Sequence, residues 1–105
     1  MLYNGCIRFI KQAMECIESK DLEGAHKAII RAQDIILEFM STLDMKYEIS
    51  HNLLALYDYL HRRLVEANTK KDVVILEEVL TFVTELRDTW AEVVKITRKQ
   101  IYKKE

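Results

Sequence analysis

Two Glu-x-x-His pairs, Glu23/His26 and Glu48/His51, are the part of the sequence best suited to binding a metal. Paired Glu-x-x-His helices supply the ligands of di-iron helical bundles. Here both pairs lie near the starts of predicted helices that run antiparallel, which places the two histidines roughly 20 Å or more apart. One metal cluster cannot span that separation. We therefore expect surface residues at both positions and no metal site.

A histidine that precedes two arginines, His61, offers a second kind of chemistry. Histidine phosphotransfer domains are also helical bundles, and each exposes one histidine that accepts a phosphoryl group. Arg62 and Arg63 are cations that could hold such a group. By helical phase, however, His61 lies roughly 40° from Tyr57, close to the apolar face. A partly buried packing histidine is the favoured interpretation, and phosphotransfer is the alternative from a different functional class.

No other chemical motif is recognisable in the sequence. It has no glycine-rich phosphate loop, no cysteine pair at zinc spacing and no nucleophile with an evident base. Cys6 and Cys16 are ten residues apart on one predicted helix, a rise of roughly 15 Å, which is beyond the reach of a disulfide. We expect free thiols, no cofactor and no enzymatic activity.

The composition favours one small helical domain in the cytoplasm. A chain of 105 residues that is 50% hydrophobic, with no proline and two glycines, has little material for tight turns or strands. Its 16 basic and 17 acidic side chains are interspersed, so it presents no broad field that would attract nucleic acid or an anionic membrane. It has neither a signal peptide pattern nor an apolar run of about 18 residues that could insert into a membrane.

The elements that must position these side chains follow from hydrophobic periodicity. Apolar residues recur every three or four positions along nearly the whole chain, which is the helical period. Asp21 and Asp72 are typical helix-start residues, and Asn68 is a candidate left-handed stop. The predicted helices span residues 1–19, 22–43, 48–67 and 72–100.

Such short connections make consecutive helices antiparallel neighbours. We therefore predict an all-α fold, an antiparallel up-down-up-down four-helix bundle that forms a single domain over residues 1–105. Helical phase assigns Leu22, Ile49, Tyr57 and Trp90 to the apolar stripes that face the core, with Tyr57 and Trp90 at the stripe centres.

Each predicted helix also carries apolar residues beyond its core stripe. In the first helix these are spaced by seven and rotated roughly 80–120° from the core centre. Contact with two neighbouring helices could require such wide arcs, but as a set they favour an exposed groove able to accept additional helices. The predicted groove residues are Leu2, Phe9, Cys16, Ile35, Phe39, Leu54, Val65, Ile75 and Phe82.

Polar and aromatic residues in a fixed order carry a family likeness. Its most specific part is Tyr57-Asp58-Tyr59 running into Arg62-Arg63-Leu64-Val65-Glu66-Ala67-Asn68. The other parts are Leu2-Tyr3-Asn4-Gly5, Ala32-Gln33-Asp34-Ile35-Ile36 with Leu43, Asp72, and Leu86-Arg87-Asp88-Thr89-Trp90. Together they resemble, from end to end of the chain, the FliS family of flagellar secretion chaperones.

The resemblance implies a cytosolic chaperone specific for flagellin. Such a protein would bind the C-terminal helical segment of flagellin, prevent premature polymerisation and assist delivery to the flagellar type III export gate. A bundle with spare apolar surface is a suitable temporary host for a segment that becomes helical only when packed. A generic helical adaptor is the remaining alternative.

Two departures from the family pattern affect these expectations. FliS-like chains begin with a polar segment that leads into the first helix and can fold over part of the groove, whereas this chain opens at Met1, inside its first predicted helix. We expect the segment to be missing, which leaves Leu2 and Phe9 uncovered and favours weak self-association. The second departure is Met45-Lys46-Tyr47, where relatives often carry glycine, and it affects only the geometry of that turn.

Overall fold

A computed structural model describes the backbone of residues 2–103 and the side chains of residues 2–93, 95 and 96. The described chain consists of helices without a strand, which confirms the predicted all-α class. The four helices are α1 (Leu2–Glu18), α2 (Leu22–Ser41), α3 (Glu48–Lys70) and α4 (Val73–Lys103).

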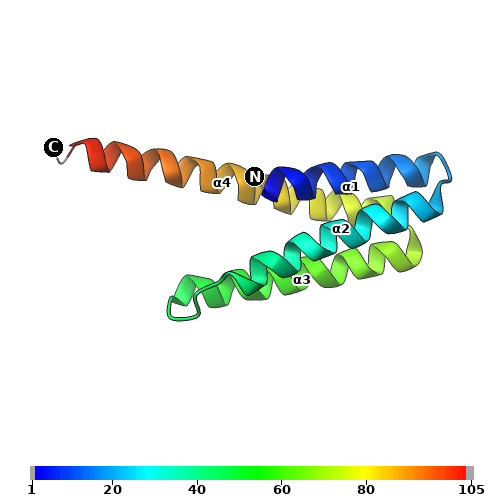
Figure 1. The fold of residues 1–105 in the computed structure, drawn as a ribbon, viewed down its shortest axis with the longest axis horizontal. Coiled ribbons are helices and arrows are strands. Elements are labelled where there is room, and N and C mark those ends of the chain that lie inside the picture. Colours follow the sequence, from blue (N-terminus) through cyan, green and yellow to red (C-terminus); the bar gives the residue numbers. More distant parts are fainter. Residues whose placement is uncertain (1, 104–105) are drawn as a thin grey trace.

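Consecutive helices run antiparallel, as Figure 1 shows, so the predicted up-down-up-down bundle is confirmed. In the described part of the chain α1 packs against α2 and α4, and α3 packs against the same two helices. The helices therefore form a ring in which α1 and α3 are diagonal to each other. The α1–α2 side and the α3–α4 side lie on opposite faces of this ring.

The connection between α1 and α2 is closed by backbone hydrogen bonds. Lys20 adopts a left-handed conformation with φ 64°. The N–H of Asp21 then donates to the carbonyl of Cys16 at 2.8 Å, and the N–H of Lys20 donates to that of Ile17 at 3.1 Å, a pattern that satisfies the last carbonyls of a helix. Asp21 caps α2 by accepting from the N–H of Gly24 at 2.9 Å, so its predicted role is confirmed.

The end of α3 differs from the prediction. The helix continues past Asn68, and the left-handed residue is Lys71, with φ 52° and ψ 46°. The Nζ of Lys71 donates to the backbone and side-chain oxygens of Asn68 at 2.6 and 2.7 Å, which fixes the turn. Asp72 caps α4, as predicted, by accepting from the N–H of Val74 at 2.9 Å.

The core runs along the axis of the ring, and every helix contributes to it. Burial of its aliphatic side chains is the main favourable contribution to folding, at roughly 25 cal/mol for each Å² of apolar surface removed from water. The largest fully buried side chains are Cys6, Ile10, Ile29, Ile36, Leu60, Leu64, Leu76, Val79 and Val83.

Three residues assigned to the core are exposed instead. Leu22 is the first residue of α2 and is 54% exposed, and Ile49, in the first turn of α3, is 60% exposed. Trp90 is 38% exposed. Helical phase does not report how far along a helix its neighbours cover it, and Leu22 and Ile49 lie in the first turns of their helices. Tyr57, by contrast, is buried as predicted.

Candidate functional site

The four helices differ greatly in length, and this opens one end of the bundle. α4 has 31 residues, whereas α1 has 17. Figure 1 shows α4 running beyond the start of α1, while α2 and α3 turn back at the same end, away from α4. Arg87 of α4 bonds to Asn4 in the first turn of α1. Trp90 lies about one turn further along α4, close to where the described part of α1 begins.

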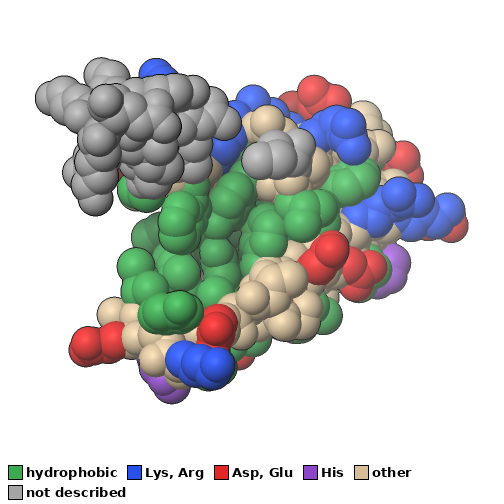
Figure 2. All heavy atoms as spheres, turned by 60° about the vertical axis from the view of Figure 1, so that its left-hand side comes forward, with side chains coloured by type: hydrophobic (Ala, Val, Ile, Leu, Met, Phe, Trp, Pro, Cys, Tyr) green, Lys and Arg blue, Asp and Glu red, His purple; other side chains and the backbone are tan. Residues whose placement is uncertain are grey.

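An apolar hollow of roughly 300 Å³ lies at this end, and we call it the open-end hollow. Residues from all four helices and from the α2–α3 connection line it. Figure 2, which brings this end forward, shows hydrophobic side chains gathered over a continuous face there. The lining residues are Tyr3, Phe39, Thr42, Leu43, Asp44, Ile49, Ser50, Leu53, Tyr57 and Trp90.

The inner wall of the open-end hollow is a cluster of three aromatic rings. The ring centroid of Phe39 lies 4.6 Å from that of Tyr3 and 5.5 Å from that of Tyr57, both in tilted arrangements. The hydroxyl groups of Tyr3 and Tyr57 are 2.8 Å apart and share a hydrogen bond. Burial raises the pKa of Tyr57, and the bond with Tyr3 raises it further, so Tyr57 stays neutral at physiological pH. The wall is thus aromatic and already assembled.

The rim of the open-end hollow is apolar and partly in water. Ile49 and Trp90 are its most exposed apolar members, with Leu43 and Leu53 half-buried beside them. The adjoining loop is held by a hydrogen bond between Nε2 of His51 and the carbonyl oxygen of Met45, at 3.1 Å. An apolar rim around a preformed wall is a surface on which a helix can lay its hydrophobic side chains.

The predicted groove residues do not form one surface. Leu2, Phe9 and Ile35 line a second hollow, between α1 and α2, together with Asn4, Gly5 and Arg8; we call it the α1–α2 hollow. The α3–α4 side carries Phe82, which is 36% exposed and makes an edge-to-face contact with Tyr59 at 6.3 Å.

The remaining groove residues are scattered. Phe39, 9% exposed, belongs to the inner wall of the open-end hollow, whereas Ile75, 6% exposed, lies in the core. Cys16 on α1 and Leu54 on α3 are half-buried, and Val65 on α3 is exposed.

The sequence matches one known protein family over most of its length. The model of the family described as flagellar protein FliS matches residues 1–97. The chain belongs to the FliS family. It is 46% identical over 99 residues to the flagellar secretion chaperone FliS of Bacillus subtilis (strain 168), a match that covers 94% of this chain and 74% of the relative.

More distant FliS chaperones align over nearly the same span. The protein of Escherichia coli (strain K12) is 32% identical over 95 residues, covering 88% of this chain and 70% of that protein. The protein of Salmonella typhimurium is 31% identical over 96 residues, covering 89% and 71%. All three relatives are named flagellar secretion chaperones. The resemblance read from the sequence is therefore confirmed.

The two Glu-x-x-His pairs of this FliS-family chain lie at opposite ends of the bundle. Nδ1 of His26 lies 2.9 Å from the side-chain nitrogen of Asn68, whereas His51 holds the α2–α3 loop at the other end of the bundle. Among the described side chains, no three His, Cys, Asp or Glu residues are placed to bind a metal ion.

The alternative phosphotransfer site has little support in this FliS fold. His61 is half-buried on α3. Arg62 pairs with Asp58 at 3.0 Å, and Arg63 forms ion pairs with Glu66 and Glu78 at 2.6 and 2.8 Å. The two cations that could have held a phosphoryl group are occupied by carboxylates. No helix in the described part of the chain is long and apolar enough to cross a membrane.

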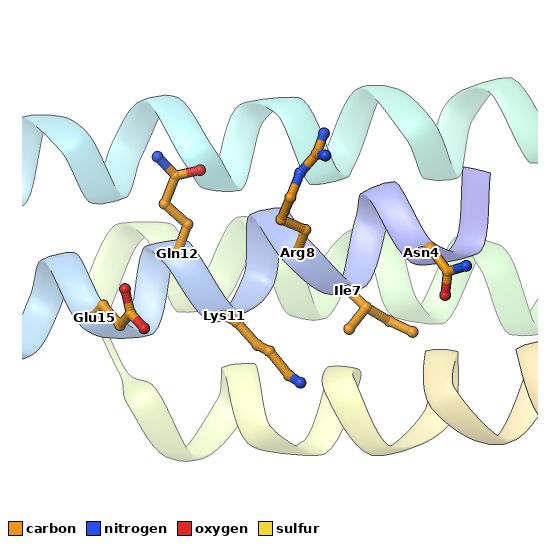
Figure 3. A pocket seen from close by; sticks show the side chains of 6 residues that line it. All are labelled: Asn4, Ile7, Arg8, Lys11, Gln12 and Glu15. Carbon is orange, nitrogen blue, oxygen red and sulfur yellow. The ribbon is translucent and has the colours of Figure 1, made fainter. Parts of the chain in front are cut away.

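A further hollow lies on the outer surface of α1 alone. Its lining residues are Asn4, Ile7, Arg8, Lys11, Gln12 and Glu15. Figure 3 shows that these side chains diverge: Arg8 and Gln12 lean towards α2, while Lys11 points towards α4. A surface from which polar groups spread apart cannot bring them together on a substrate. We assign no chemistry to it.

Proposed function

We propose that this FliS-family protein is a cytoplasmic export chaperone for flagellin. It binds the C-terminal helical segment of flagellin, prevents premature polymerisation and assists delivery of the subunit to the flagellar type III export gate. The open-end hollow is the part of the surface that receives the apolar side chains of this segment. The protein acts as a binding partner and catalyses no reaction.

The observation that carries this proposal is the exposed apolar rim around the aromatic wall. Ile49 is 60% exposed to water, and Trp90 is 38% exposed. Covering them with the apolar face of a helix removes that surface from water without rearranging the core, because Tyr3 and Tyr57 are already locked together. A client segment loses conformational entropy on binding, and a preformed surface adds no reorganisation cost of its own.

Trp90 is the only tryptophan in the chain, which supplies a direct test. A tryptophan-free peptide from the flagellin C-terminus, titrated into the protein, should shift the emission of Trp90 to shorter wavelength and protect it from acrylamide quenching. Ile49→Asp should weaken that binding by about 2 kcal/mol, or roughly thirtyfold, through loss of an apolar anchor. Because Ile49 is mostly exposed, the variant should melt close to the parent.

Phe82→Ala is the matched control, since Phe82 is as exposed as Trp90 but lies on the α3–α4 side. Binding that is lost in Phe82→Ala and retained in Ile49→Asp would move the client site away from the open end. No binding of the flagellin peptide would leave a generic adaptor as the better account. Light scattering of polymerising flagellin tests the consequence: equimolar parent protein should suppress filament growth, and Ile49→Asp should not.

A further inference from the structure

Two arginines from different helices converge on one aromatic ring in the α1–α2 hollow. The guanidinium carbon of Arg8, on α1, lies 5.2 Å from the ring centroid of Phe9, and that of Arg31, on α2, lies 5.6 Å from the same centroid. Both arginines are exposed, while Phe9 is half-buried and packs against the core. Figure 3 shows Arg8 leaning from α1 towards α2.

These arginines differ from the others whose side chains are described. Arg62 and Arg63 form ion pairs with carboxylates, and Arg87 bonds to Asp88 and to Asn4. Within the described side chains, neither Arg8 nor Arg31 has an ion pair or a hydrogen-bond partner. Two cations held near one ring also repel each other. An added carboxylate between these two groups would therefore gain two cationic partners at once.

The floor beside the two guanidinium groups is apolar and has room. Leu2, 44% exposed, and Ile35 contribute aliphatic surface to the same hollow, and Gly5 leaves the helix backbone between them uncovered. A Cβ at Gly5 would meet only the Cδ1 of Ile35, at 3.6 Å. The hollow thus offers a place for an apolar side chain, with Arg8 in its lining and Arg31 beside it, close to the ring of Phe9.

We propose that this face binds an acidic amphipathic helix of a partner protein other than the flagellin segment. One apolar side chain of the partner occupies the hollow over Gly5, and a carboxylate lies between Arg8 and Arg31. Guanidinium groups bind carboxylates through strong charge-assisted hydrogen bonds, and Phe9 holds both groups in place by cation–π contact. The face is a second binding surface and does not rest on the client-binding role of the open-end hollow.

Other occupants fit this face less well. A second copy of the chain, docked by a two-fold axis, would bring the same two arginines against themselves. Polymeric anions would meet the carboxylates of Glu15, Asp34 and Glu38, which are exposed on the same two helices. A short acidic helix can place its carboxylates beside Arg8 and Arg31 alone, and so avoids repulsion by those exposed carboxylates.

The test uses the full chain labelled with ¹⁵N and two synthetic helical peptides of equal length. One peptide carries Leu and Glu on the same face, and the other carries Gln in place of every Glu. We expect the Glu peptide to shift the Nε–H resonances of Arg8 and Arg31, and its affinity to fall with added salt. The Gln peptide should bind about tenfold more weakly or worse.

Variants identify the residues that are responsible. Arg8→Gln and Arg31→Gln should each weaken the Glu peptide about tenfold, while Arg62→Gln, at an exposed arginine of α3, should leave its affinity unchanged. Gly5→Leu should block the hollow and weaken binding, whereas thermal melts should show a folded protein.

Four outcomes would overturn the proposal. The first is no binding of the Glu peptide at millimolar concentration, and the second is equal affinity for the two peptides. The third is weaker binding of the flagellin peptide in Arg8→Gln or Arg31→Gln, which would make the face part of the client site. The fourth is loss of self-association in the same variants by sedimentation, which would make the occupant a second copy.

Discussion

The hydroxyl groups of Tyr3 and Tyr57 lie 2.8 Å apart and join α1 to α3 across a diagonal of the bundle. These two helices do not pack directly on each other in the described chain. The bond is therefore a specific tie across the open end, and it fixes the first turn of α1 against the wall of the open-end hollow.

Removing one of the two hydroxyls should lower the free energy of unfolding more than removing both. Tyr3→Phe leaves the buried hydroxyl of Tyr57 without its partner, so the free energy of unfolding should fall by about 1–2 kcal/mol. The double variant Tyr3→Phe/Tyr57→Phe should recover part of that loss, because no unpaired donor remains. Urea unfolding of the single and double variants measures this coupling. Strictly additive losses would show that the bond contributes nothing specific.

The two cysteines should differ sharply in reactivity. Cys6 is fully buried, and burial raises its pKa to about 12, so almost no thiolate is present at neutral pH. Cys16 is half-buried near the end of α1. Iodoacetamide followed by mass spectrometry should modify Cys16 in the native protein and Cys6 only after unfolding in urea. Native labelling of Cys6 in a Cys16→Ala variant would contradict the packing of α1.

Acid should weaken the contact between α3 and α4. Hydrogen bonds from Arg63 and then from Tyr59 lower the pKa of Glu78 below its ordinary value. A lowered folded-state pKa means that the carboxylate stabilises the fold at neutral pH, and that this contribution is lost as the pH falls from the ordinary glutamate pKa through the lower folded-state pKa. The free energy of unfolding, measured in urea between about pH 6 and pH 3, should fall less steeply with decreasing pH in Glu78→Gln than in the parent.

Glu77→Gln is the control for that experiment, because Glu77 is exposed on the same turn of α4. In this variant the free energy of unfolding should fall with decreasing pH as steeply as in the parent. An equal flattening in both variants would mean that the acid response is a general effect of charge rather than of the Arg63 contact.

Trp90 should matter less to the fold than a large aromatic residue usually does. With 38% of its surface exposed, Trp90→Ala should lower the free energy of unfolding by about 1–2 kcal/mol. Leu64→Ala, at a fully buried position, should cost about 2–5 kcal/mol despite the smaller side chain. Unfolding in urea, followed by circular dichroism, gives the free energy of unfolding of the two variants. A larger loss for Trp90→Ala would place Trp90 in the core after all.

Much of the fold was predictable from local signals in the sequence. The helical period gave four helices, and Asp21 and Asp72 marked two of their starts, because an N-cap is a local device that involves neighbours three residues away. The end of α3 was not predictable in this way. Lys71 rather than Asn68 is left-handed, and its Nζ bonds back to the oxygens of Asn68, a contact that residue preferences do not report.

The candidate site was harder to predict, for a related reason. Periodicity reports which way a side chain points but not whether another helix lies opposite. Helical phase assigns Trp90 to the core, yet in the described chain it is 38% exposed and lines a hollow beside the first turn of α1. The predicted lengths of the first and fourth helices already differed, and that difference was the available signal. No pattern in one dimension places Arg8 and Arg31 over the same ring.

The open end also has a kinetic consequence. A ligand that enters the middle of a helical bundle must wait for helices to separate, so its association rate depends on how often the bundle opens. The open-end hollow instead lies at the surface, lined by residues of α4 and of the α2–α3 connection, and its rim residues Ile49 and Trp90 are exposed (Figure 2). Capture should therefore proceed at an ordinary bimolecular rate, on the order of 10⁵–10⁷ M⁻¹s⁻¹. A protein with this geometry can be very stable and still bind quickly.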